Sequence, residues 1–314
     1  MNICKICGKS SQLNEHAVKE MMFGMRTRFT YFECDYCGCL QIKNIPEDIN
    51  IYYRPFEYYS FKVSAQKIKL LLFKKLIVWI KMSCNLKIIR SAGCLFGSKF
   101  ENYFQWLSYI DNISYESRVL DVGCGSGALL TEMRELGFMR LNGVDPFIQA
   151  SKNEECISIN KSELKNVEGS YDLIMLHHSF EHIPDQDQAM RKLNNLLVLG
   201  GSLLIRVPVA DCYAWRTYGE NWYQIDAPRH FYLHSCKSLT MLANKNGFNL
   251  VHSYRDSTEL QFSISEMYAK DIASDKIDAK LLAVDIKENR KRAAVLNAQN
   301  DGDQACFIFK KTYE

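Results

Sequence analysis

The sequence predicts an α/β protein in which a doubly wound, mostly parallel sheet follows a small cysteine-rich domain. Three observations support this prediction. From about residue 106 onward, short apolar runs alternate with stretches of helical periodicity. Residues 119–127 read V-L-D-V-G-C-G-S-G, an apolar run that ends in a glycine-rich turn. Near the start of the chain, two Cys-x-x-Cys-Gly pairs are separated by 26 residues.

The glycine-rich turn follows a predicted buried strand that ends at Asp121. Gly123, Gly125 and Gly127 permit positive φ angles and a close approach of a ligand to the backbone, which a side chain would prevent. A helix is predicted to begin at about Ala128. A ligand can therefore lie against the turn at the start of this helix.

Further apolar runs predict the remaining strands. The second to fifth strands are expected over residues 141–147, 156–159, 171–176 and 200–208, with a helix over 186–197. The sixth and seventh strands are expected over 248–254 and 306–311, and Ser235 is expected to cap a helix that ends near Gly247. Polar residues gather after the strands, which predicts a ligand crevice at their carboxyl ends.

The loop D-V-G-C-G-S-G and the later Y-D-L-I followed by E-H resemble the motifs of class I S-adenosylmethionine (SAM)-dependent methyltransferases. The resemblance covers about residues 100–314 and implies a seven-stranded Rossmann-like sheet whose last strand is antiparallel. A dinucleotide-binding oxidoreductase is the alternative, but the tight G-x-G-x-x-G spacing is missing. The resemblance implies that Asp145 accepts the ribose hydroxyls and that Phe147 covers the adenine. The SAM-binding residues are expected to be Asp121, Gly123, Cys124, Gly125, Gly127, Asp145, Pro146, Phe147, Ser162 and His177.

The loop after the fourth strand carries the candidate catalytic residues. In the family this loop faces the methionine end of SAM, and here it contains His177, His178, Glu181 and His182. A hydroxyl that attacks the methyl group must lose its proton, and histidine titrates near neutral pH. His178 is the first candidate base. Glu181 and His182 match a pair that is common across the family, which favours a supporting role.

Residues 209–235 form a long aromatic insertion after the fifth strand, where a substrate lid is expected. The sequence D-A-P-R-H at 226–230 resembles a motif of one large bacterial methyltransferase group. Arg229 could bind a phosphate or carboxylate and His230 could be an alternative base, or both could join the lid to the core. The candidate substrate contacts are Trp215, Tyr218, Trp222, Tyr223 and Arg229.

The cysteine pairs predict a structural zinc site in a domain spanning residues 1–50. Cys4, Cys7, Cys34 and Cys37 have the spacing of zinc-ribbon knuckles, and four thiolates satisfy a tetrahedral ion. A redox role is disfavoured because the βαβ context is missing, and Cys39 is a spare thiol. The chain has twelve cysteines, which in an intracellular protein favour thiols or metal ligands over disulfides.

Residues 51–105 are predicted to connect the two domains. The aromatic cluster at 51–61 resembles segments of methyltransferases from bacterial surface-polysaccharide clusters. Residues 61–100 contain nine Lys/Arg and no acid, so the rest of the chain has a net charge of −6. A helical hairpin that roofs the active site is the first interpretation of this segment. Contact of residues 62–90 with an anionic membrane is the second, and nucleic-acid contact is the weakest.

These features predict a cytoplasmic enzyme that methylates a small molecule or glycan, such as a sugar, nucleotide sugar or lipid-linked saccharide. O-methylation is favoured, since the loop after the fourth strand lacks both the Asn/Asp-Pro-Pro-aromatic tetrad of many N-methyltransferases and a catalytic cysteine. A sugar C-methyltransferase, an RNA methyltransferase and a non-catalytic SAM-binding module remain as alternatives. The acidic remainder argues against RNA. Peripheral contact with the inner membrane face is left open, as is the oligomeric state.

Overall fold

The computed structural model describes residues 2–11, 14–53, 105–278, 282 and 284–312. The predicted connector at 51–105, including the segment 62–90, lies almost wholly outside the described residues. None of the helices in the described part is long and apolar enough to cross a membrane.

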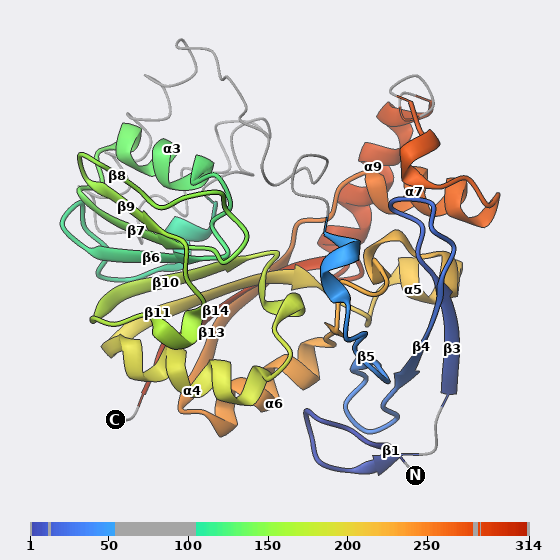
Figure 1. Cartoon of the computed structure of the whole chain (residues 1–314), viewed down its shortest axis with the longest axis horizontal. Helices are drawn as coiled ribbons and strands as arrows, with labels where there is room; N and C mark the ends of the chain where they lie inside the picture. Colours follow the sequence, from blue (N-terminus) through green and yellow to red (C-terminus); the bar gives the residue numbers. More distant parts are fainter. Residues whose placement is uncertain (1, 12–13, 54–104, 279–281, 283, 313–314) are drawn as a thin grey trace.

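An eight-stranded sheet forms the centre of the molecule (Figure 1). Its strand order is β13-β14-β11-β10-β6-β7-β9-β8, with β6, β7, β9, β10 and β11 parallel to one another and β14 antiparallel to β11. The sequence therefore correctly predicted all seven strands and the antiparallel last strand; the short edge strand β8 was not predicted. The bounds are β6 Arg118–Val122, β7 Arg140–Val144, β8 Lys152–Glu154, β9 Ile157–Asn160, β10 Tyr171–His177, β11 Leu197–Pro208, β13 Phe248–Arg255 and β14 Gln304–Lys311.

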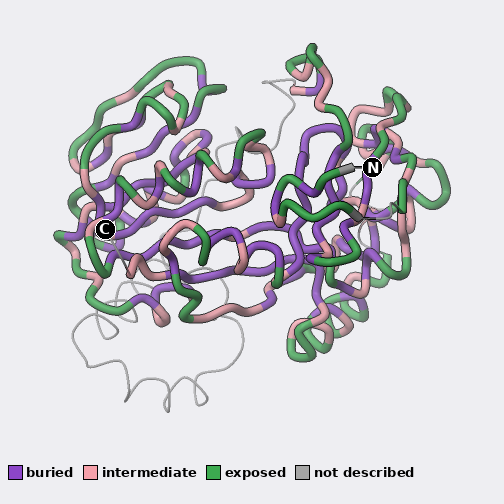
Figure 2. Tube along the Cα trace, turned by 90° about the horizontal axis from the view of Figure 1, so that it is seen from below, coloured by how far each residue is buried: buried purple, intermediate pink, exposed green. Residues whose placement is uncertain are grey.

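Helices cover both faces of this sheet. Successive residues of a strand point to opposite faces, and here both faces carry apolar side chains that pack against helices. Val119 of β6 packs in the cluster with α3 (Ala128–Leu136), whereas its neighbour Leu120 packs in the cluster with α4 (Gln186–Leu196) and α6 (Cys236–Lys245). Figure 2 shows the buried strands between the more exposed outer elements. Ser235 caps α6, as predicted, with its side chain accepting from the backbone of Ser238.

The N-terminal part forms a second, four-stranded sheet of order β12-β5-β4-β3. β3 (Asn14–Lys19), β4 (Arg28–Glu33) and β5 (Leu40–Ile42) come from the predicted zinc ribbon, but β12 (Tyr232–Leu233) comes from the end of the predicted lid. The short β1 (Asn2–Ile3) and β2 (Ser10–Ser11) pair separately. One hydrophobic cluster includes both ribbon residues and sheet residues, so the two parts share a core.

The connection between β13 and β14 is a helical excursion that the sequence analysis missed. It contains α7 (Leu260–Ala269), η9 (Ser274–Lys276) and α9 (Ile286–Ala298). α7 packs on α5 (Tyr213–Tyr218) and on η8 (Tyr223–Ile225), and both belong to the predicted lid. The aromatic insertion is therefore enclosed between this excursion and the ribbon, as the right-hand part of Figure 1 shows.

Candidate functional site

The glycine-rich turn is held against two neighbouring segments. The backbone amides of Gly123 and Cys124 both donate to the carbonyl of Val144, which ties the turn to β7. Gly123 has a φ of 78°, and a Cβ there would lie 2.4 Å from that of Ser179 in the loop after β10. Only glycine permits both the conformation and this approach. The Ser179 hydroxyl donates to Val122 O at 2.6 Å, so the two loops form one edge of the site.

Two buried carboxylates stand at the ends of adjacent strands. Asp145 accepts from Gly125 N at 3.0 Å and from Phe147 N at 2.8 Å, one bond to each carboxylate oxygen. It was predicted to accept ribose hydroxyls; here it also fixes the shape of the glycine-rich turn. Burial raises the pKa of Asp145, and burial together with the charge of Asp145 raises the pKa of Asp121 to about 7.

The other predicted SAM-binding residues lie around the same strand ends. Phe147 is exposed and stacks on Tyr53 with ring centroids 5.0 Å apart. Pro146 is exposed and Ser162 is half-buried. The sulfur of Cys124 faces Gly143 of β7, because a Cβ on that glycine would lie 2.7 Å from it. The side chain of Cys124 therefore packs against β7.

The two consecutive histidines after β10 have different surroundings. The His177 ring lies 6.1 Å from that of Trp106, and burial lowers the pKa of His177 to about 3. The His178 side chain is 24% exposed, with Nδ1 3.5 Å from Oε1 of Glu181. Its Nε2 lies 3.2 Å from Nη1 of Arg206. Because a guanidinium only donates, Nε2 of His178 is the unprotonated nitrogen in this arrangement.

Glu181 lies between two histidines. Its carboxylate is fully buried, and neither oxygen has a hydrogen-bond partner among the described residues. Nε2 of His230 is 3.9 Å from Glu181 Oε1, and the His182 and His230 rings are 4.8 Å apart. Although burial opposes ionisation, His178 and the other two imidazoles lower the pKa of Glu181 to about 2. The structure thus brings together the four predicted catalytic residues: His178, Glu181, His182 and His230.

Arg229 does not have the role expected of a substrate contact. Its guanidinium is fully buried and is bound by Glu20 of the ribbon at 3.2 Å, by Asp226 and by the Tyr52 carbonyl at 3.0 Å. These bonds use the guanidinium on protein groups, so an acceptor phosphate cannot reach it. The alternative interpretation, in which Arg229 joins the lid to the rest of the protein, is the one that the structure supports.

The aromatic residues of the predicted lid are also engaged inside the protein. Trp222 is buried and donates to Asp303 at 3.0 Å, and Trp215 donates to Glu33 of β4 at 3.3 Å. Tyr218 donates to Glu266 of α7 at 3.2 Å, and Tyr223 packs near the same helix. These side chains fill the space between ribbon and α7, which the sequence could not show because α7 was not predicted. The segment therefore packs between the ribbon and α7 and does not form an open lid.

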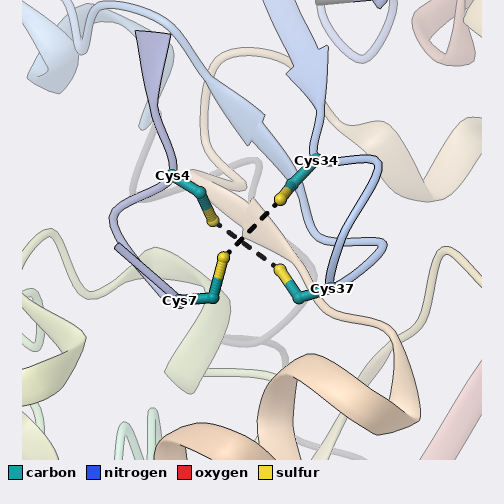
Figure 3. Close-up of side chains that lie close together, drawn as sticks. All are labelled: Cys4, Cys7, Cys34 and Cys37. Carbon is teal, nitrogen blue, oxygen red and sulfur yellow. Dashed lines mark hydrogen bonds between the residues drawn. The ribbon is translucent and has the colours of Figure 1, made fainter. Parts of the chain in front are cut away.

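The four predicted zinc ligands converge from two turns (Figure 3). The Cys4 and Cys37 sulfurs are 3.7 Å apart, as are those of Cys7 and Cys34. Tetrahedral zinc with Zn–S bonds of about 2.3 Å separates its sulfurs by about 3.8 Å, so the set fits this ion. The buried Gln41 donates to the Cys4 sulfur at 3.1 Å, and the hydrogen bond from Cys37 lowers the pKa of Cys4 to about 4. Cys39 is buried beside this set but is not part of it.

Comparison with known proteins agrees with this geometry. Residues 98–253, about half of the chain, match the model of a family described as a methyltransferase domain. This match, the strand order and the glycine-rich turn at the end of β6 make the protein a SAM-dependent methyltransferase of the class I fold. It is therefore an enzyme, and the non-catalytic alternative is withdrawn.

Curated relatives are ubiquinone biosynthesis O-methyltransferases of Xanthomonas. The protein of X. oryzae pv. oryzae is 30% identical over 116 residues, which is 31% of this chain and 47% of the relative. That of X. campestris pv. campestris is 32% identical over the same length and coverage. The chain thus spans about half the length of the curated relatives it matches.

Solved structures that resemble the chain include two SAM-dependent methyltransferases. The Archaeoglobus fulgidus protein has 19% identity and a TM-score of 0.43, covering 75% of this chain and 99% of that one. The Mesorhizobium loti protein has 14% identity and a TM-score of 0.43, covering 67% and 99%.

Sequence reasoning missed four residues of the site and its surroundings. Tyr53 contacts both Phe147 and His182, Arg206 contacts His178, Glu20 binds Arg229, and Gln41 binds Cys4. Arg206 carried a signal, because it is a charged residue within the otherwise apolar run of β11. The other three come from the N-terminal part, and their contacts depend on how the ribbon docks.

Proposed function

We propose that the protein transfers the methyl group of SAM to an oxygen atom of a small-molecule or glycan acceptor. SAM would lie on the glycine-rich turn between Asp121 and Asp145, with Phe147 beside the adenine. The loop that carries His178 packs directly on this turn through Ser179, so a sulfonium methyl at the end of β6 would face it. SAM supplies the methyl group as an electrophile.

The observation that carries this proposal is the pair formed by His178 and Glu181. The buried carboxylate of Glu181 faces Nδ1 of His178. In this position the carboxylate orients the imidazole ring and stabilises the imidazolium that forms, as the buried aspartate of a catalytic triad does for its histidine. The acceptor oxygen attacks the methyl carbon, the carbon–sulfur bond breaks with its electrons going to sulfur, and Nε2 of His178 takes the hydroxyl proton. The acceptor must replace the contact of Nε2 with Arg206 for this to occur.

His230 is a weaker candidate for the base. Only 4% of its side chain is exposed, and its Nε2 lies 3.9 Å from Glu181 Oε1. An acceptor hydroxyl reaches a partly exposed imidazole more readily than a buried one. We therefore assign His230, Glu181 and His182 to the support of His178.

O-directed transfer is favoured by the name of the Xanthomonas relatives, which are O-methyltransferases. Because the match covers less than half of these relatives, their substrate is not carried over to this chain. The aromatic segment at 51–61 and its resemblance to surface-polysaccharide methyltransferases favour a sugar, nucleotide sugar or lipid-linked saccharide. Sugar C-methylation is the second candidate, and membrane contact through residues 62–90 remains a prediction.

We further propose that Cys4, Cys7, Cys34 and Cys37 bind a structural zinc ion. Four thiolates leave no open position for a reactant, so the ion would stabilise the ribbon without taking part in methyl transfer. Ser235 connects the cysteine cluster to the methyltransferase sheet domain. Its hydroxyl donates to the Cys37 carbonyl, and the same side chain caps α6.

Single-turnover methyl transfer tests the assignment of the base. Nucleotide sugars should first be screened as acceptors. His178→Ala should lower the rate by about 10² to 10⁴ while SAM affinity is retained. The control is His252→Ala, on β13. A large loss only in His230→Ala would move the role to that residue, and near-parent rates for both would exclude a histidine base.

A further inference from the structure

The interior between the ribbon and the methyltransferase sheet contains more negative than positive side chains. Glu20 and Glu181 are fully buried and Asp226 is 13% exposed, whereas Arg229 is the one cation that the described contacts place among them. Both Glu20 oxygens accept hydrogen bonds from backbone amides, those of Phe23 and Met25. Three carboxylates and one guanidinium leave a deficit of two positive charges.

Glu181 is the one of these carboxylates that no described arginine or lysine contacts. Arg229 is committed to Glu20 and Asp226, and it makes no described bond to Glu181. A buried carboxylate without hydrogen bonds or a counter-charge is strongly destabilising. The groups facing it are the imidazoles of His178, at 3.5 Å, and His230, at 3.9 Å. Within the part of the chain that the structure describes, no arginine or lysine therefore compensates Glu181.

A backbone carbonyl holds the Nδ1 atom of each supporting histidine. Nδ1 of His230 lies 2.7 Å from the Gln224 carbonyl, and Nδ1 of His182 lies 2.9 Å from the Arg229 carbonyl. Because a carbonyl only accepts, each Nδ1 carries the proton and each Nε2 has a free lone pair. A backbone carbonyl that fixes the tautomer in this way is the usual partner of a metal-binding histidine. Nε2 of His230 also points toward Glu181 Oε1 at 3.9 Å.

We propose that Glu181, His182 and His230 bind a divalent metal ion next to the acceptor site. One ligand atom from each lies within 4.8 Å of the other two. Ligand atoms about 2.1 Å from one ion lie about 3.0 to 3.5 Å apart, so the cluster would contract by roughly 1 Å. Two imidazoles and one carboxylate suit a transition metal such as Zn²⁺, Mn²⁺, Fe²⁺ or Co²⁺ and leave coordination positions open. The charge of the ion matches the deficit.

An ion here would also serve the proposed reaction, a role that rests on the proposed function although metal binding itself does not. Its open positions would take an oxygen of the acceptor, such as one of two neighbouring hydroxyls of a sugar. Since a carboxylate has two oxygens, Glu181 can bind the ion and still face Nδ1 of His178. Tyr53, whose hydroxyl lies 3.1 Å from His182 Nδ1, would border this second site.

Metal stoichiometry tests the proposal independently of activity. The full-length protein should be dialysed against micromolar Co²⁺ and analysed by elemental analysis and visible absorption. We expect about two ions per chain: one with the sulfur-to-cobalt charge-transfer bands of a thiolate site, and one with only weaker d–d bands. Glu181→Gln and His230→Gln should each lose the second ion and keep the first, whereas Cys34→Ser should lose the first.

Two further variants distinguish metal binding from the proposed role of His178 in methyl transfer. His178→Ala should keep both ions although methyl transfer falls, and Glu181→Asp should retain part of the second binding. If a substitution at Glu181 prevents folding, the Cys34→Ser protein decides, because it should still bind an ion with d–d bands only. One ion per chain in the parent, together with none of the d–d spectrum in Cys34→Ser, would overturn the proposal.

Discussion

The guanidinium of Arg229 lies 3.2 Å from Oε1 of Glu20, and both side chains are fully buried. The two residues are 209 positions apart in the sequence. Glu20 directly follows β3 of the ribbon sheet, and Arg229 directly precedes His230. This ion pair therefore connects the docking of the N-terminal domain to the position of the histidine cluster.

Substitution of Arg229 should lower the stability of the whole protein. Arg229→Met leaves Glu20 and Asp226 without their cation, and breaking a buried pair in this way costs about 3 to 5 kcal/mol. Urea unfolding should show this loss. The control is Arg216→Met, because the Arg216 pair with Asp301 is 57% exposed on the arginine side and should contribute less than about 1 kcal/mol. Equal effects of the two substitutions would show that the Glu20 pair has no structural role.

The thiolate cluster should depend on Gln41 as well as on its ligands. Cys34→Ser should abolish zinc binding at the ribbon, whereas Gln41→Leu removes the donor to Cys4 and should weaken binding by about 10- to 100-fold. Competition with a chromophoric chelator measures both. Cys39→Ser is the matched control, since this buried thiol lies outside the cluster and its loss should leave zinc affinity unchanged.

Asp121 should make the apoprotein less stable as the pH rises. Burial raises its folded pKa to about 7 from 3.8, so the unfolded chain loses this proton at lower pH than the folded chain. Its contribution is therefore favourable to folding at low pH and is lost between about pH 4 and 7. Relative to Asp121→Asn, the parent should lose about 2 kcal/mol of unfolding free energy between about pH 5 and 6.5.

The same comparison with Asp111→Asn supplies the control, because Asp111 forms an exposed pair with Lys310. That variant should track the parent at both pH values. If the difference in unfolding free energy between the parent and Asp121→Asn does not change with pH, the pKa of the folded Asp121 carboxyl lies near its ordinary value.

Motifs whose function is local were predictable from the sequence. The glycine-rich turn, Asp145 and the cysteine pairs each act through neighbours in the sequence or through the order of parallel strands, and all lie where they were expected. Arg229, Trp215 and Trp222 were misjudged because their partners, Glu20, Glu33 and Asp303, come from distant segments. No local pattern showed that the ribbon adds β12 to its sheet or that a helical excursion encloses the aromatic insertion. A stretch rich in aromatic and charged residues can form either an open lid or a buried domain junction, so its composition does not distinguish the two.

The arrangement of Asp145 makes its substitution the sharpest probe of the SAM site. Asp145→Ala removes the proposed acceptor of the ribose hydroxyls and also frees Gly125 N from its 3.0 Å bond, so the turn loses its anchor. Hydrogen bonds to a charged group contribute about 1.5 to 3 kcal/mol each, which corresponds to at least a tenfold loss of affinity. Asp111→Ala, far from the turn, should bind SAM like the parent.

Isothermal titration calorimetry with SAM is the decisive measurement of the proposed SAM site. The full-length protein should bind about one SAM per chain, and Asp145→Ala, while still folded, should bind it at least tenfold more weakly. Absence of SAM binding by the parent protein, or an unchanged affinity in Asp145→Ala, would contradict the proposed site.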